Sequence, residues 1–206
     1  MDERALQRDG EQTTMNPPQS KKIYIVNGYQ ASPNDHWYPW LSQKLQQAGH
    51  VAKRVVLAQA QQPDFDSWQK FLAVQMPEID QNTIIISHQL ASVSVLHYLT
   101  QYFERTGATI RAGIFIAGFK DSLPAQPQLQ AFIQKAQYKQ NVLQTHMPLV
   151  IQFVSPNDPL VPPPEALKLG HYLNAQMHEV PNAGNFRKQD GFAEFPALWQ
   201  VLQPLL

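Results

Sequence analysis

The sequence predicts a single α/β domain with a mostly parallel sheet and helices on both faces. Short runs rich in Val and Ile alternate with longer segments whose apolar residues recur at helical spacing. The short runs are almost continuously apolar, as expected for strands buried on both faces. A length of 206 residues with 43% hydrophobic content suffices for one buried core and is too small for two typical domains.

Each expected element follows from its local pattern. Residues 1–21 are polar and unpatterned, which predicts a flexible N-terminal tail and a domain covering 22–206. The first strand ends at the turn signal Asn27-Gly28, and the first helix is followed by Gly49, a C-terminal stop. The expected strands cover 22–26, 51–57, 83–87, 112–117, 149–154 and 176–180. The expected helices cover 36–48, 66–76, a segment ending at Tyr102, 126–138, 164–173 and 192–202.

The composition excludes several classes of function. Lys+Arg 16 balance Asp+Glu 16 and no basic patch appears, so we expect no nucleic-acid partner. No apolar run approaches membrane-spanning length and no signal pattern begins the chain, so we expect no membrane association and a cytoplasmic location. With Cys 0, no His/Asp/Glu cluster of metal-ligand spacing and no glycine-rich phosphate loop, we expect neither a metal nor a cofactor.

The segment 83–93 carries the pattern with the most chemical content. Its pattern predicts a buried strand, a sharp turn and the start of a helix. In a nucleophile elbow, this arrangement presents a serine above an α/β sheet. The central residue of this turn is Gln89, whose amide is a very poor nucleophile.

Four expected strand ends carry recognisable residues, in the chain order of a serine hydrolase: first loop, elbow, acid, last loop. The chain resembles the small serine α/β-hydrolases of the YdeN and retinoblastoma-binding-protein type over about 22–206. The resemblance rests on the motifs at 36–41, 157–162, 184–186 and 190–196 and on the Ile-rich strand before His88. It implies an α/β-hydrolase fold with a minimal lid and a Ser-Asp-His triad.

The chain departs from that family where the chemistry is concentrated. The family's serine position is Gln89 and its histidine position is Asn185, while its acid is present as Asp158. Asparagine does not titrate near neutral pH and therefore cannot cycle a proton. The backbone N–H groups of Tyr29 and Leu90 should still form a pair like an oxyanion hole, because they do not depend on side-chain identity.

The surroundings of these positions leave two interpretations open. We expect Asn27, Gly28 and His88 at the pocket, with His88 pointing beneath the elbow. Gln89, Asp158 and Asn185 then form either a satisfied polar network that stabilises the fold or a ligand pocket lined by amides.

Other side chains offer little as replacements for the missing groups. Ser87 and Ser92 should pack near the tight turn, and His171 and His178 should lie away from the strand tips. We therefore interpret the chain as a catalytically impaired or inactive homologue that binds a small-molecule ligand or a protein partner. The alternative is a weak or unconventional serine hydrolase acting on a small ester or amide.

Overall fold

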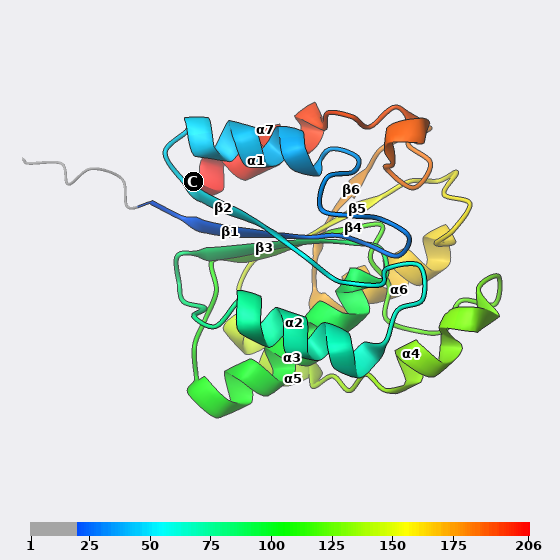
Figure 1. Cartoon of the computed structure of the whole chain (residues 1–206), viewed down its shortest axis with the longest axis horizontal. Helices are drawn as coiled ribbons and strands as arrows, with labels where there is room; N and C mark the ends of the chain where they lie inside the picture. The colour runs from blue at the N-terminus through cyan, green and yellow to red at the C-terminus, as the bar shows by residue number, and fades with distance from the viewer. Residues whose placement is uncertain (1–19) are drawn as a thin grey trace, which may run out of the picture.

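The computed structural model describes residues 20–206, so the tail predicted over 1–21 lies almost entirely outside the described residues. Within them, six strands form one sheet in the order β2-β1-β3-β4-β5-β6 (Figure 1), and every neighbouring pair is parallel. The strands are β1 (Lys22–Val26), β2 (Val51–Val55), β3 (Thr83–His88), β4 (Ala112–Ile116), β5 (Val150–Val154) and β6 (Gln176–Glu179). The predicted fold class is confirmed.

Helices cover both faces of the sheet. Figure 1 shows α1 and α7 on one face and α2, α3 and α5 on the other. The helices are α1 (Tyr38–Gln47), α2 (Phe65–Gln75), α3 (Ala91–Thr106), α4 (Gln130–Gln134), α5 (Gln140–His146), α6 (Pro163–Leu173) and α7 (Pro196–Leu202). The central strands β1, β3, β4 and β5 are buried almost throughout, which explains their continuous Val and Ile content.

The strand order reverses between β1 and β3, and this point places the functional loops. In open α/β sheets, the crevice at such a reversal, beyond the carboxyl ends of the strands, is the usual ligand site. Val26 is paired with Ser87, and His88 with Ile116, so β1, β3 and β4 end at nearly the same level. The loop after β1 and the turn after β3 therefore lie side by side.

Several predicted helices begin or end differently in the structure, most of them by one or two residues. The expected helix 126–138 is wrong: a 3-10 turn (Pro127–Leu129) precedes the short α4, and α5 follows separately. The closing helix begins at Pro196 rather than at 192, because proline suits the first helical turn. Helix α2 begins one residue earlier than expected, since Asp64 caps it by accepting a hydrogen bond from the Ser67 N–H at 2.8 Å.

None of the helices in residues 20–206 combines the length and the apolar character needed to cross a membrane.

Candidate functional site at the carboxyl ends of the strands

The turn after β3 keeps the backbone geometry of a nucleophile elbow although it carries glutamine. Gln89 has φ = 54°, in the left-handed region that non-glycine residues rarely adopt. Its N–H donates to the Ile116 carbonyl at 2.9 Å, and its carbonyl accepts from the Ser92 hydroxyl at 2.6 Å. The strained turn is therefore fixed by hydrogen bonds to β4 and α3.

Gly28 lets the first loop pack directly against this turn. A Cβ at position 28 would lie 2.9 Å from the His88 carbonyl oxygen and 3.2 Å from both Cβ and Oε1 of Gln89. Only glycine fits so close an approach without movement of its neighbours. The loop that carries Tyr29 is consequently held against the elbow.

A chain of buried hydrogen bonds connects three of the four loops below the elbow. Tyr38 Oη accepts from the Gly28 N–H at 3.4 Å and lies 2.5 Å from His88 Nδ1. His88 Nε2 lies 2.8 Å from the Asn185 carbonyl oxygen, which only accepts, so Nε2 carries the proton and Nδ1 accepts from Tyr38. Burial lowers the pKa of His88 to about 3, which keeps the ring neutral.

Asp158 and Asn185, which the resemblance places at the acid and base positions, are in direct contact. Asn185 Nδ2 donates to Asp158 Oδ2 at 2.7 Å, while Asp158 Oδ1 accepts from the N–H groups of Leu160 and Val161 at 2.8 and 3.0 Å. Burial raises the pKa of the Asp158 carboxyl, and these three hydrogen bonds oppose that shift. Asn185 thus makes the contact to the acid that a triad histidine would make.

The other end of the Asn185 amide has no partner. Asn185 is fully buried, and its Oδ1 accepts no hydrogen bond from residues 20–206. Because the nitrogen is required by the carboxylate, turning the amide over would place two oxygens against each other. The unsatisfied acceptor is therefore a consequence of how Asp158 orients the side chain.

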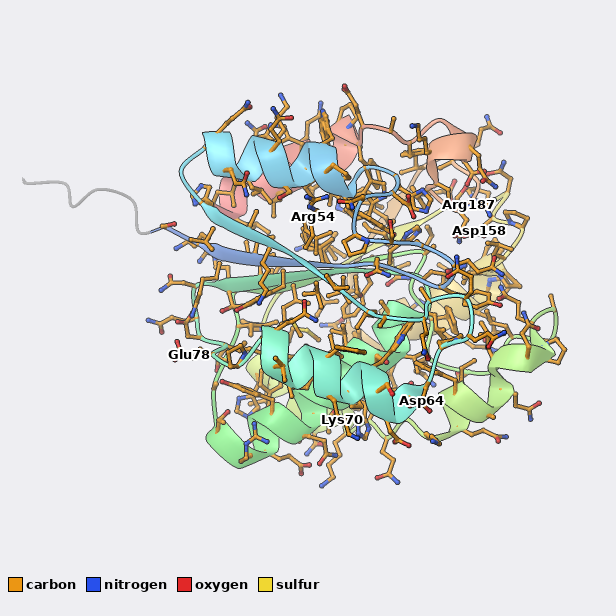
Figure 2. The ribbon with its side chains drawn as sticks, in the orientation of Figure 1. Arg54, Asp64, Lys70, Glu78, Asp158 and Arg187 are labelled. Carbon is orange, nitrogen blue, oxygen red and sulfur yellow. The ribbon has the colours of Figure 1, made fainter. Side chains whose placement is uncertain are left out.

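A cavity of about 210 Å³ opens where these loops meet. Figure 2 places Asp158 and Arg187 together at this edge of the molecule, with Glu78 at the opposite edge. The lining residues are Tyr29, Gln30, His36, His88, Gln89, Leu160, Asn185, Arg187 and Gln189. Asn27 and Gly28, expected at the pocket, do not line it: Asn27 is buried and donates to the Ala31 carbonyl at 2.7 Å.

Within the described part of the chain, two backbone donors beside the cavity remain free. Neither the Tyr29 N–H nor the Leu90 N–H has an acceptor there. Tyr29 lines the cavity itself, and Leu90 follows Gln89 directly at the start of α3. These are the two N–H groups that the sequence indicated for an oxyanion-hole-like pair.

Five lining residues were not identified from the sequence, although His36 and Leu160 lie within its recognisable motifs and Arg187 and Gln189 lie directly beside them. His36 begins the motif 36–41, and Arg187 follows the motif 184–186. Arg187 forms an ion pair with Asp190 through Nε at 3.0 Å and a second nitrogen at 3.3 Å. The five residues are Gln30, His36, Leu160, Arg187 and Gln189.

The residues considered as replacements lie elsewhere. Ser87 is fully buried within β3, and the Ser92 hydroxyl is occupied by the backbone of Gln89 and Phe119. His171 lies on the exposed surface of α6. His178, in β6, stacks on Phe153 of the neighbouring strand β5. In residues 20–206, no group of three or more His, Asp or Glu side chains is placed to hold a metal ion.

An elbow after β3, an acid after β5 and a third position after β6 are the arrangement of an α/β-hydrolase. The sequence matches the family model described as serine hydrolase over residues 23–204, and the chain belongs to that family.

Two relatives are similar to this chain over nearly their whole length. YdeN of Bacillus subtilis is 28% identical over 185 residues, which cover 89% of this chain and 95% of YdeN. The serine hydrolase RBBP9 of Rattus norvegicus is 21% identical over 193 residues, which cover 93% of this chain and 98% of RBBP9. The crystal structure of the B. subtilis ydeN product superimposes with a TM-score of 0.82 over 90% of this chain and 98% of that one, at 26% identity.

Similarity of fold extends to esterases. Est1E of Butyrivibrio proteoclasticus has a TM-score of 0.64 over 92% of this chain and 87% of its own, at 13% identity. At this identity the likeness concerns the fold alone.

Proposed function

We propose that this member of the serine hydrolase family binds a small ligand in its cleft without cleaving it. The observation that carries the proposal is the pair of amides at the two reactive positions, Gln89 at the strained elbow and Asn185 on the acid. Acyl transfer in this fold requires an alcohol to attack and an imidazole to move its proton. Neither group is present at these positions.

The two histidines at the cavity do not replace the missing base. Both ring nitrogens of His88 are engaged, one by Tyr38 and one by the Asn185 carbonyl. His36 Nδ1 accepts from the Lys188 N–H at 3.1 Å, so its proton is on Nε2, and burial lowers the pKa of the ring. At neutral pH, His36 therefore offers a donor to the cavity.

One hydroxyl does contact a histidine, and its position argues against catalysis. Tyr38 is fully buried beneath the elbow and is not among the residues lining the cavity. Burial raises the pKa of its phenol, which disfavours the anionic form a nucleophile would need. The alternative of a weak hydrolase using a neighbouring serine or water gains no support from this geometry.

The cavity favours a small ligand over a protein partner as the occupant. Its volume of about 210 Å³ is smaller than the roughly 300–1,000 Å³ of pockets for drug-sized ligands, which suits a ligand of only a few non-hydrogen atoms.

A serine-directed fluorophosphonate probe tests the absence of turnover. We expect no covalent adduct by intact-mass analysis of the folded protein, because no activated hydroxyl lines the cavity. The Gln89→Ser/Asn185→His variant provides the positive control. Labelling of the unchanged protein at one discrete serine, located by peptide mapping, would refute the proposal.

A further inference from the structure

The cleft offers hydrogen-bond donors on one side. The N–H groups of Tyr29 and Leu90 are free among the described residues, and Leu90 precedes the long helix α3. The amino end of a helix carries partial positive charge and favours an oxygen acceptor. A carbonyl oxygen of the ligand fits this side of the cleft.

The cleft offers an acceptor on the other side. Asn185 Oδ1 is buried without a partner in a residue that lines the cavity. Asp158 holds the nitrogen of the same amide, so the oxygen is the end that remains for a ligand. Buried acceptors in native structures normally have a donor, and this position calls for an N–H or O–H group.

Gln89 also lines the cavity, and its side-chain amide has no partner in the described chain. The side chain is 3% exposed, and its Oε1 is beside the position that a Cβ of Gly28 would take. An amide presents one acceptor and two donors. It therefore matches a second amide better than it matches an ester or a carboxylate.

The charges around the cavity argue against an anionic ligand. Arg187 is the cationic residue among those that line it, and Asp190 engages its guanidinium through two nitrogens. The two histidines are neutral, and Asp158 stands behind Asn185. A carboxylate would meet only a guanidinium whose charge is already balanced by Asp190, and it would present no donor to Asn185.

We propose that the ligand is a small uncharged carboxamide. Its carbonyl oxygen accepts from the N–H groups of Tyr29 and Leu90, and its own N–H donates to Asn185 Oδ1. Gln89 pairs with the remaining polar edge of the ligand. This assignment rests on the proposed function, since a cleaved amide would not remain in the cleft.

Three probes of matched size and shape test the assignment: butyramide, butyrate and pentan-2-one. Pentan-2-one keeps the carbonyl and lacks the N–H, while butyrate replaces the amide by a charge. We expect protein-observed NMR titration to give on the order of tenfold tighter binding for butyramide than for either of the others, because they leave Asn185 Oδ1 unpaired. The side-chain amide signals of Gln89 and Asn185 should shift at the lowest probe concentration with butyramide.

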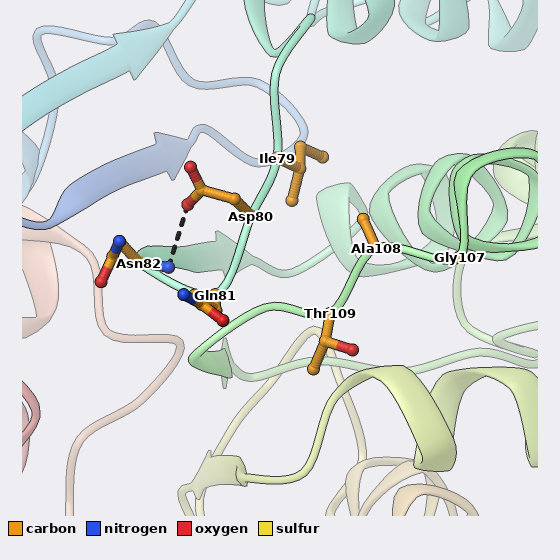
Figure 3. Close-up of a pocket in the computed structure, with 7 residues that line it drawn as sticks. All are labelled: Ile79, Asp80, Gln81, Asn82, Gly107, Ala108 and Thr109. Carbon is orange, nitrogen blue, oxygen red and sulfur yellow. Dashed lines mark hydrogen bonds between the residues drawn. The ribbon is translucent and has the colours of Figure 1, made fainter.

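Two further measurements test whether the preference for butyramide comes from the hydrogen bond to Asn185 Oδ1 or from the rest of the cleft. N,N-dimethylbutyramide, used with the unchanged protein, removes both N–H groups and should bind no better than pentan-2-one. In Asn185→Leu, butyramide should lose its advantage over pentan-2-one. The matched control Gln81→Leu removes an exposed amide from the hollow at the opposite edge of the sheet (Figure 3) and should leave all affinities unchanged.

The outcomes distinguish the two proposals. If pentan-2-one or butyrate binds as tightly as butyramide, the carboxamide assignment is overturned and ligand binding in the cleft stands. If none of the three perturbs the signals of Gln89, Leu90 or Asn185, binding in the cleft itself is refuted.

Discussion

The hollow at the amino ends of β3 and β4 is larger than the cleft at the carboxyl ends, about 550 Å³ against about 210 Å³. Yet its polar side chains are either paired, as at Asp80, or exposed to solvent, as at Gln81 and Thr109. Figure 3 shows the Asn82 N–H donating to Asp80, at 2.9 Å, and Asp80 also pairs with Lys22 at 2.8 Å. The cleft instead contains a buried acceptor and two backbone donors without partners. Unsatisfied hydrogen-bonding groups, rather than volume, mark the site.

The strongest test of this comparison is to restore turnover at the cleft. Gln89→Ser with Asn185→His should raise ester hydrolysis on the order of 10³-fold or more, because losing nucleophile or base in a known protease costs about 10⁶. Initial rates with a panel of nitrophenyl esters measure this.

Either single variant is the control and should stay near the background, since nucleophile and base act as a unit. A folded double variant that remains inert toward the whole panel would mean that these loops do not align as a triad.

The second test is stability. His88→Leu should lower the free energy of unfolding by about 2–4 kcal/mol, because it leaves the buried Tyr38 hydroxyl without an acceptor for its proton and the buried Asn185 carbonyl without a donor. Asp80→Ala, at the opposite edge, should cost about 1 kcal/mol or less, because its ion pair is half exposed. Urea denaturation measures both; equal losses would contradict the distinction between the two edges.

The third test is pH. The pKa of His88 is about 3 in the folded protein against 6.5 ordinarily, so between these values the unfolded chain binds more protons. Stability should fall as pH decreases below about 6.5, by up to about 1.4 kcal/mol per unit from this group. The difference in unfolding free energy between the unchanged protein and His88→Leu should therefore shrink as the pH is lowered. A constant difference would place the His88 pKa near its ordinary value.

The smallest expected effect concerns backbone strain. Gln89→Gly should raise the free energy of unfolding by about 0.5–1 kcal/mol, because glycine adopts positive φ without the penalty that Gln89 carries. Gln59→Gly is the matched control, at φ = 55° on an exposed loop. If only the control is stabilised, the Gln89 side chain makes contacts that offset its strain.

The sequence predicted the strands of the sheet more accurately than the helices α4 and α5. Strand β1 begins and ends where its apolar run does, since burial on both faces requires a continuous pattern. Helix α5 was missed because only Leu143 of its residues is buried, which leaves almost no apolar periodicity to detect.

The candidate site was predictable where a residue sits in a motif and not where loops converge. The positions of Gln89, Asp158 and Asn185 were implied by the resemblance to the serine hydrolase family, whose motifs follow the same order of strand ends. Arg187 and His36 belong to different loops that meet only in the folded chain, joined by the contact of His36 with the Lys188 backbone. No local pattern in the sequence states that these loops meet.

The hydrogen-bonded chain from Tyr38 through His88 to the Asn185 carbonyl has a consequence for how such a protein can change over generations. It uses backbone atoms of Gly28 and Asn185, so replacing the side chains that face the cleft leaves the frame intact. A lineage can therefore exchange reactive groups for amides, and exchange them back, without rebuilding its architecture.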